Sequence, residues 1–267
     1  MLKPEGYTPK ADTFEYLYHA KERGLAIEAE VAGVAYPNGS PAWLLTFPGL
    51  DGARGLVPAS ETGLGSPQLM PRFVGQKIRV KVKGLDRESG LAACSRREVV
   101  AEAEERLKAE LRPGQVIEAL VRAVLPRDRE NGKPARLLLD VGGGVLVEIP
   151  YRKAAVSQAR SLAQQFPPGS TLEVEVVSVE PLVVSPVKKT DPWQAAPDFH
   201  RGQFLACTVV AVRGSTVFLE PDLAPGVVGI APVPLRGAVA RGDRVTCAVA
   251  KFDREKKKLH LRLRGRI

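Results

Sequence analysis

The chain has 267 residues, and 39 Lys and Arg against 30 Asp and Glu give it a formal net charge of +9 at pH 7. This positive excess favours a polyanionic partner, although charge alone says nothing about fold. No apolar run approaches the roughly 18 residues of a membrane span, and the N-terminus lacks the apolar centre of a signal peptide. We therefore expect a cytoplasmic protein without a membrane partner.

The first 23 residues are predicted to hold a leader and one short helix. Asp12 can cap this helix and Gly24 can end it. Phe14, Leu17 and Tyr18 share one helical face, which favours a helix packed on the domain that follows. A docking helix for another protein stays open as the alternative.

From Gly24 onward one unit repeats three times. Segments 24–34, 114–124 and 202–212 match position by position, each with Gly first and Val at the eighth and eleventh places. A later strand of each unit ends in proline, which suits strand ends because proline donates no ladder hydrogen bond. These prolines are Pro58, Pro150 and Pro232. Five short strands in roughly 70 residues are typical of a small closed barrel of the OB type.

The predicted fold class is therefore all-β, with three tandem five-stranded OB-fold barrels, a connecting α-helix between the first two and a short N-terminal helix. The expected boundaries are 1–23 for the leader and helix, 24–95 for the first barrel, 96–112 for the connecting helix, 113–187 for the second barrel, 188–200 for a linker and 201–267 for the third barrel.

One strand of the first unit, near residues 77–83, alternates between apolar and cationic positions. Its apolar face is β-branched, and its other face repeats a cation about every 6.7 Å, twice the strand rise. These cations are Lys77, Arg79, Lys81 and Lys83. A solvated face is one reading. Phosphate contact is favoured because no acid interrupts the stripe and Arg96 and Arg97 follow nearby.

The two junctions between units differ in composition. The first carries an apolar stripe at helical spacing, Val99, Val100, Ala103, Leu107 and Leu111. We expect this helix to pack on an adjoining barrel and to make the junction semi-rigid. The second junction, 185–200, is rich in proline and polar residues and is predicted to be an extended linker with little structure of its own.

The matched units resemble the RNA-binding repeat named after bacterial ribosomal small-subunit protein one, the S-one domain. The likeness lies in the initial Gly-Gln with spaced valines, in GLVPAS followed by Glu61, and in GQKIRVKVKGLDRE running into CSRRE. It implies OB-type barrels that bind single-stranded RNA, with aromatics on strands two and three stacking the bases. Many family members have histidine at the three strand-end prolines, so one expected base contact is missing from each unit.

The resemblance places Trp43 as the strand-two aromatic of the first unit and offers Phe218 in the third. The register of Phe218 is open by one residue, and a slip of one would turn its ring into the core. The last strand alternates leucines with a cationic outer face, which is either an RNA contact or a solvated edge that guards against aggregation. Its outer residues are Lys258, His260, Arg262 and Arg264.

The second unit departs from this pattern, with Glu173 and Glu175 at the places of Arg79 and Lys81. Carboxylates there would repel phosphate, so we expect a spacer or a protein-docking module that binds RNA weakly. Basic residues instead surround a loop whose Asn131-Gly132 pair suggests a hairpin turn, and they are Arg127, Arg129, Lys133 and Arg136.

No catalytic residue, metal ligand or cofactor is predicted. Cys94, Cys207 and Cys247 lack metal-ligand or redox spacing and are expected to be buried, reduced thiols. The matched units fill almost the whole chain, which leaves no room for a catalytic domain.

The function implied by the resemblance is that of a monomeric, non-catalytic protein that binds single-stranded mRNA in a translation-related role, with no small-molecule substrate. The ribosome or ribosomal RNA stays open as a further partner. An RNA-turnover or regulatory adaptor, and a ribosome- or protein-docking factor with weak RNA binding, are the alternatives. We expect the first unit to be the main RNA-binding unit, the second to bind RNA weakly, and the third to contribute through its last strand.

Overall fold

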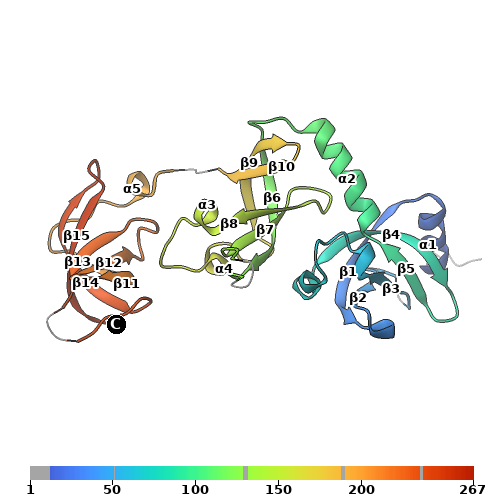
Figure 1. Cartoon of the computed structure of the whole chain (residues 1–267), viewed down its shortest axis with the longest axis horizontal. Helices are drawn as coiled ribbons and strands as arrows, with labels where there is room; N and C mark the ends of the chain where they lie inside the picture. The colour runs from blue at the N-terminus through green and yellow to red at the C-terminus, as the bar shows by residue number, and fades with distance from the viewer. Residues whose placement is uncertain (1–12, 51, 129–131, 188–189, 235–236) are drawn as a thin grey trace, which may run out of the picture. The chain divides into compact units, whose positions relative to one another are not determined.

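The structure is a computed structural model that describes all residues except 1–12, 51, 129–131, 188–189 and 235–236 (Figure 1). The expected helix cap Asp12, the turn residue Asn131 and the loop cation Arg129 lie outside the described residues. The fold is mostly β, as predicted, with three five-stranded sheets and few helices. None of the helices in the described part of the chain has the length and apolar character that a membrane crossing requires.

The first sheet closes into a barrel in the order β1-β2-β3-β5-β4. All neighbouring strands in it are antiparallel except β3 and β5, which pair in parallel. Short 3-10 helices, η1 to η3, lie in the connections. The bounds are β1 Ala26–Ala35, η1 Pro37–Gly39, β2 Ala42–Thr46, β3 Arg54–Pro58, η2 Ala59–Glu61, η3 Pro67–Phe73, β4 Lys77–Asp86 and β5 Leu91–Ser95.

Helix α1, Thr13–Glu22, packs beside strand β4 of this barrel. Leu17 and Ala20 are its buried residues, which confirms the prediction of a helix packed on the following domain. The predicted face is partly wrong, because Tyr18 is 48% exposed and Ala20 takes the buried place one turn after Leu17. Gly24 follows with φ +61°, in the left-handed region that glycine favours at helix ends.

The second sheet has the same strand order as the barrels but stays open, as β10-β9-β6-β7-β8. The described residues make no ladder between β8 and β10, the pair that would correspond to the parallel contact in the first barrel. The connection between β8 and β9 contains two single helical turns, α3 and α4. The bounds are β6 Val116–Leu125, β7 Arg136–Asp140, β8 Leu146–Pro150, α3 Tyr151–Ala154, α4 Leu162–Gln165, β9 Thr171–Val179 and β10 Leu182–Pro186.

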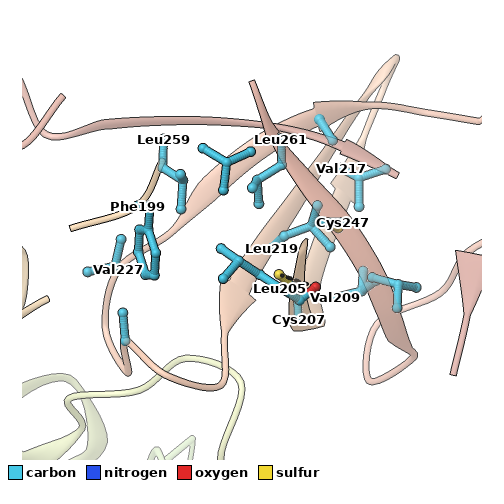
Figure 2. Packing of buried hydrophobic residues seen from close by; sticks show 14 of the residues in the cluster. Phe199, Leu205, Cys207, Val209, Val217, Leu219, Val227, Cys247, Leu259 and Leu261 are labelled. Carbon is cyan, nitrogen blue, oxygen red and sulfur yellow. Dashed lines mark hydrogen bonds between the residues drawn. The ribbon is translucent and has the colours of Figure 1, made fainter. Parts of the chain in front are cut away.

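The third sheet closes into a barrel in the order β11-β12-β13-β15-β14, equivalent to that of the first. Its core gathers Leu205, Cys207 and Val209 from β11 with Leu259 and Leu261 from β15, all at most 3% exposed (Figure 2). The bounds are β11 Phe204–Arg213, β12 Thr216–Pro221, β13 Gly229–Pro232, β14 Arg244–Asp253 and β15 Lys258–Arg266.

The chain divides into two compact units. One comprises Met1–Ala123, Leu138–Val147 and Glu175–Val184, and the other comprises Val124–Leu137, Glu148–Val174 and Ser185–Ile267. Because both units include strands of the second sheet, the boundaries of the three sequence repeats remain a prediction.

Within the first of these units, helix α2, Arg97–Glu110, packs against the β7–β8 turn. Three consecutive glycines with positive φ, 142–144, form this turn. A Cβ on Gly143 would lie 2.3 Å from the Cβ of Ala103, and one on Gly142 would lie 3.5 Å from Leu107. The apolar stripe of the helix therefore packs as predicted, through glycines that allow backbone and helix to approach closely.

The second junction differs from its prediction as a linker with little structure. Asp191 accepts a hydrogen bond from the backbone N–H of Trp193 at 3.1 Å and begins a single turn, α5, Pro192–Ala195. Ala196 and Phe199 are buried in the third core, and Trp193 stacks on Phe252 at 6.3 Å between ring centroids. The segment is therefore ordered by the packing of its apolar residues 193, 196 and 199, despite its proline and polar content.

Candidate nucleic-acid interface

A shared bulge fixes which strand-two residues face outward. In β1 the pairing with β2 shifts between Val31 and Gly33, and in β11 the pairing with β12 shifts between Val209 and Ala211. The shifts occupy the same place in each repeat. After the shift Gly33 pairs with Leu44 and Ala211 pairs with Phe218, so Leu44 and Phe218 are equivalent, as are Trp43 and Val217.

Trp43 is in the core, which corrects the expectation that its ring stacks RNA bases. It is 0% exposed, and its indole N–H donates to the carbonyl of Met70 at 2.9 Å. Its ring lies 5.3 Å from that of Phe73. The predicted register was off by one residue, and a shift of one moves a side chain to the opposite face.

Phe218 lies on the outer face, as one of the two expected registers placed it. It is half-buried, and the guanidinium of Arg213 lies 5.8 Å from its ring centroid. On the neighbouring strand β13, Ile230 pairs with Phe218, and Ile230 in turn pairs in parallel with His260 of β15. Ile230 is 38% exposed and His260 is half-buried, so the three side chains form an accessible row over β12, β13 and β15.

The outer face of β15 adds positive charge to this row. Lys258, Arg262 and Arg264 are exposed, while Leu259 and Leu261 between them are buried. In the part of the chain that the structure describes, none of these three cations makes an ion pair. Lys251, opposite His260 on β14, is exposed as well. The predicted alternation is confirmed, and its charges are available to a phosphate.

The cationic stripe of β4 lies beside acids that are distant in sequence. Lys77 pairs with Glu28 of β1 at 2.8 Å, and this hydrogen bond raises the pKa of Lys77. Lys83 pairs with Glu98 of α2 at 2.7 Å. Lys81 is ion-paired with Glu102, and its hydrogen bond lowers the pKa of that carboxyl.

The fourth member of the stripe, Arg79, is exposed and lies opposite Glu28 in the ladder. The sequence indicated an uninterrupted cationic face, but the folded chain places a carboxylate beside each of its lysines. The stripe therefore presents much less net positive charge than the sequence suggests.

The two arginines after the stripe also have partners. Arg96 is 2% exposed and donates to the carbonyls of Thr62 and Gly144, each at 2.7 Å. Burial lowers its pKa to about 10. It joins the first barrel to the glycine turn, which corrects its expected role in RNA contact. Arg97 is exposed and pairs with Glu61 at 2.6 Å.

The basic residues of the second unit differ in exposure and in partners. Arg136 pairs with Glu148 at 2.7 Å, and its guanidinium is largely buried. Glu175 is exposed and Glu173 half-buried on β9, at the places held by cations in the first barrel. Arg127 is exposed.

The three cysteine thiols are free and buried, as predicted. Burial raises the pKa of Cys94 to about 12. Within the described residues no group of three or more His, Cys, Asp or Glu side chains could hold a metal ion. Sequence reasoning missed Arg213, Ile230 and Lys251. Arg213 is the last residue of β11, and only the observed pairing of β11 with β12 brings it to Phe218.

No family model matches the chain. Small ribosomal subunit protein bS1 of Staphylococcus epidermidis is 28% identical over 229 residues, which cover 82% of this chain. The chain resembles the ribosomal S-one proteins. The match covers 53% of the relative, so the chain spans about half the length of the curated relative it matches.

Three solved structures show partial similarity. A complex of a/eIF2alpha, aDim2p and rRNA from Pyrococcus horikoshii OT3 has a TM-score of 0.24 at 25% identity, covering 26% of this chain and 46% of that chain. A multidomain protein with nucleic acid binding domains from Streptococcus pneumoniae has 0.26 at 13% identity, covering 91% and 74%. Drosophila Unr CSD456 has 0.18 at 12% identity, covering 57% and 62%. Scores this low do not bear on the function of this chain.

Proposed function

We propose that this chain is a non-catalytic, single-stranded RNA-binding protein whose main contact surface is the outer row of the third barrel. The observation that carries the proposal is the accessible ring of Phe218 beside exposed cations of β15 that have no acidic partner among the described residues. The proposed contact residues are Arg213, Phe218, Lys251, Lys258, His260, Arg262 and Arg264.

The chemistry of the row fits a single strand better than a duplex. An aromatic face stacks any base at about 1–3 kcal/mol, and such a face can be reached only by an unpaired base. Cations beside it gain free energy by releasing counterions condensed on phosphates. Aromatic and cationic groups together thus recognise a flexible, unpaired polyanion.

Under the proposal the ligand is mRNA, the role is translation-related and cytoplasmic, and the chain acts as a monomer. The resemblance to bS1, a ribosomal protein, supports the link to translation. An RNA-turnover or regulatory adaptor would use the same surface. A protein- or ribosome-docking role is favoured by one observation on the first barrel, where Glu28, Glu98 and Glu102 neutralise β4. Under the proposal the four cations of β4 and Arg97 contribute weakly to RNA contact.

The proposal is tested by fluorescence anisotropy with an unstructured RNA of about 12 nucleotides at several salt concentrations. Phe218→Ala should weaken binding about 5- to 150-fold, from the stacking free energy of about 1–3 kcal/mol. Arg262→Gln with Arg264→Gln should lower the salt slope by about 0.7 for each phosphate that is no longer neutralised.

The matched control is Tyr18→Ala, which removes an exposed aromatic ring from helix α1 and should leave affinity unchanged. Equal affinity of the wild type and the Phe218 variant would rule out the third barrel as the main surface. Tight binding to ribosomes without binding to free RNA would favour the docking role.

A further inference from the structure

A second aromatic ring lies exposed on the third barrel, outside the Phe218 row. Phe204 begins β11 and is 65% exposed, while its neighbour Leu205 is 3% exposed in the core. Alternation along the strand therefore points the ring of Phe204 outward. A large aromatic side chain this exposed buries little apolar surface on folding. Stability therefore does not explain why an aromatic residue occupies this position.

The ladder places Phe204 in line with a cation. Phe204 pairs with Ala248 of β14, and Ala248 pairs with Arg262 of β15. Directly opposed residues have Cβ atoms about 4.5–5.5 Å apart, so ring and guanidinium flank the small alanine. Ala248 is only 5% exposed although it occupies an outward position. An aromatic ring and a charged group thus lie on the two strands that flank Ala248.

Strand β15 connects this row to the Phe218 row. His260 lies in the row of Phe218 and Ile230, and Arg262 lies in the row of Phe204. The two residues are two positions apart on one face of β15, about 6.6 Å along the strand. The cationic strand therefore has an aromatic platform on each side, Phe218 toward β12 and Phe204 toward β11.

We propose that Phe204 and Arg262 form a second base-binding subsite for single-stranded RNA. An RNA strand would reach it by crossing β15 from the row of Phe218, Ile230 and His260. The inference rests on the proposed function and extends it. Charge complementarity identifies the ligand, because Arg262 and Arg264 have no acidic partner within the described residues. A ring beside phosphate-binding cations is the arrangement that holds consecutive nucleotides.

The subsite predicts a dependence on oligonucleotide length. An RNA of about 4 nucleotides fills the Phe218 row alone, and one of about 12 reaches both rows, within the range of site sizes for one OB fold. Phe204→Ala should weaken the 12-mer about 5- to 150-fold and change the 4-mer less than about twofold. Phe218→Ala should weaken both oligonucleotides.

The full-length chain is used with two further variants. Phe204→Tyr keeps an aromatic face and should bind the 12-mer like the wild type, whereas Phe204→Leu keeps only an apolar group and should resemble Phe204→Ala. Tyr36→Ala removes a ring of 67% exposure from the first barrel and serves as the matched control. Circular dichroism should show all variants folded, since Phe204 is not in the core.

The outcomes separate the two proposals. If Phe204→Ala binds the 12-mer like Tyr36→Ala while Phe218→Ala still weakens it, the second subsite is wrong and the proposed function stands. Equal losses with the 4-mer and the 12-mer would also overturn the subsite, because they indicate one compact site. If the wild type binds neither RNA in a salt-dependent manner, both proposals are wrong.

Discussion

At the scale of single residues, one position in a strand decides whether an aromatic ring stabilises the barrel or faces solvent. Trp43 and Phe218 both lie in the second strand of their repeats, but Trp43 is equivalent to the core residue Val217. The sequence permitted either register for Phe218, because apolar residues flank it on both sides. The bulge that settles the matter leaves no signal in composition.

Trp43→Ala should therefore act on stability. Replacing a fully buried Trp by Ala typically costs about 3–5 kcal/mol, and here the carbonyl of Met70 also loses its donor. We expect urea denaturation to show a loss of this order in the transition of the first barrel. Trp43→Phe should lose less, because it retains most of the packing. A variant that unfolds like the wild type but loses RNA affinity would place the ring on the surface.

At the scale of secondary-structure elements, the neighbours of β4 determine the net charge of its cationic stripe. Strand β4 supplies the lysines, but strand β1 and helix α2 supply the acids that pair with them. A strand read alone cannot reveal this, because its partners come from segments that only the fold brings together. The alternation was predictable, whereas the net charge of the face depended on neighbours in the tertiary structure.

Removing those acids should reveal the stripe. Glu98→Gln with Glu102→Gln frees Lys83 and Lys81, so the affinity for single-stranded RNA should rise and the salt slope should steepen by at most about 1.4. Binding titrations from low to moderate salt measure both quantities. Glu105→Gln, which removes an acid paired with Lys108 on the same helix, is the control and should leave the slope unchanged. An unchanged slope in the double variant would mean that β4 does not reach RNA.

The glycine turn at the first junction allows a second test at this scale. Gly143→Ala should destabilise the junction, because the new Cβ would lie 2.3 Å from the Cβ of Ala103. Gly132→Ala is a matched control, since its φ of +66° resembles the +60° of Gly143 but a Cβ there would meet no atom of the described residues within 4 Å. Hydrogen exchange of α2 should rise in the Gly143 variant beyond any rise in the control. Equal protection in both variants would show that the close approach is unimportant.

At the scale of the whole molecule, the threefold sequence repeat was the strongest predictor of the fold. Matching glycines and valines predicted three OB-type sheets, and the structure confirms them. The role of the second junction was not predictable from its prolines, because Phe199 and Trp193 find partners only on the completed third barrel. The site was predicted in part: Phe218 and β15 are placed as one reading expected, and Trp43 and Arg96 are not.

The packing of this junction makes a prediction about fragments. A fragment of residues 190–267 should unfold at a higher temperature than one of residues 201–267, because the shorter fragment lacks Ala196 and Phe199 of the core. Loss of a buried Phe side chain costs about 3–5 kcal/mol, a large share of the stability of a small domain. Differential scanning calorimetry would measure the difference. Equal melting temperatures would restore the view of 188–200 as a passive linker.

The matching bulges of β1 and β11 also bear on how the barrels can diverge. Because the irregularity occupies the same place in both repeats, the strand positions beside it correspond, although the connection between β1 and β2 is longer than that between β11 and β12. Leu44 and Ala93 occupy the places of Phe218 and His260, and both lie on the outer face. Barrels that share this pairing can differ in a ligand surface through two substitutions, because the strands that display the surface pair in the same register.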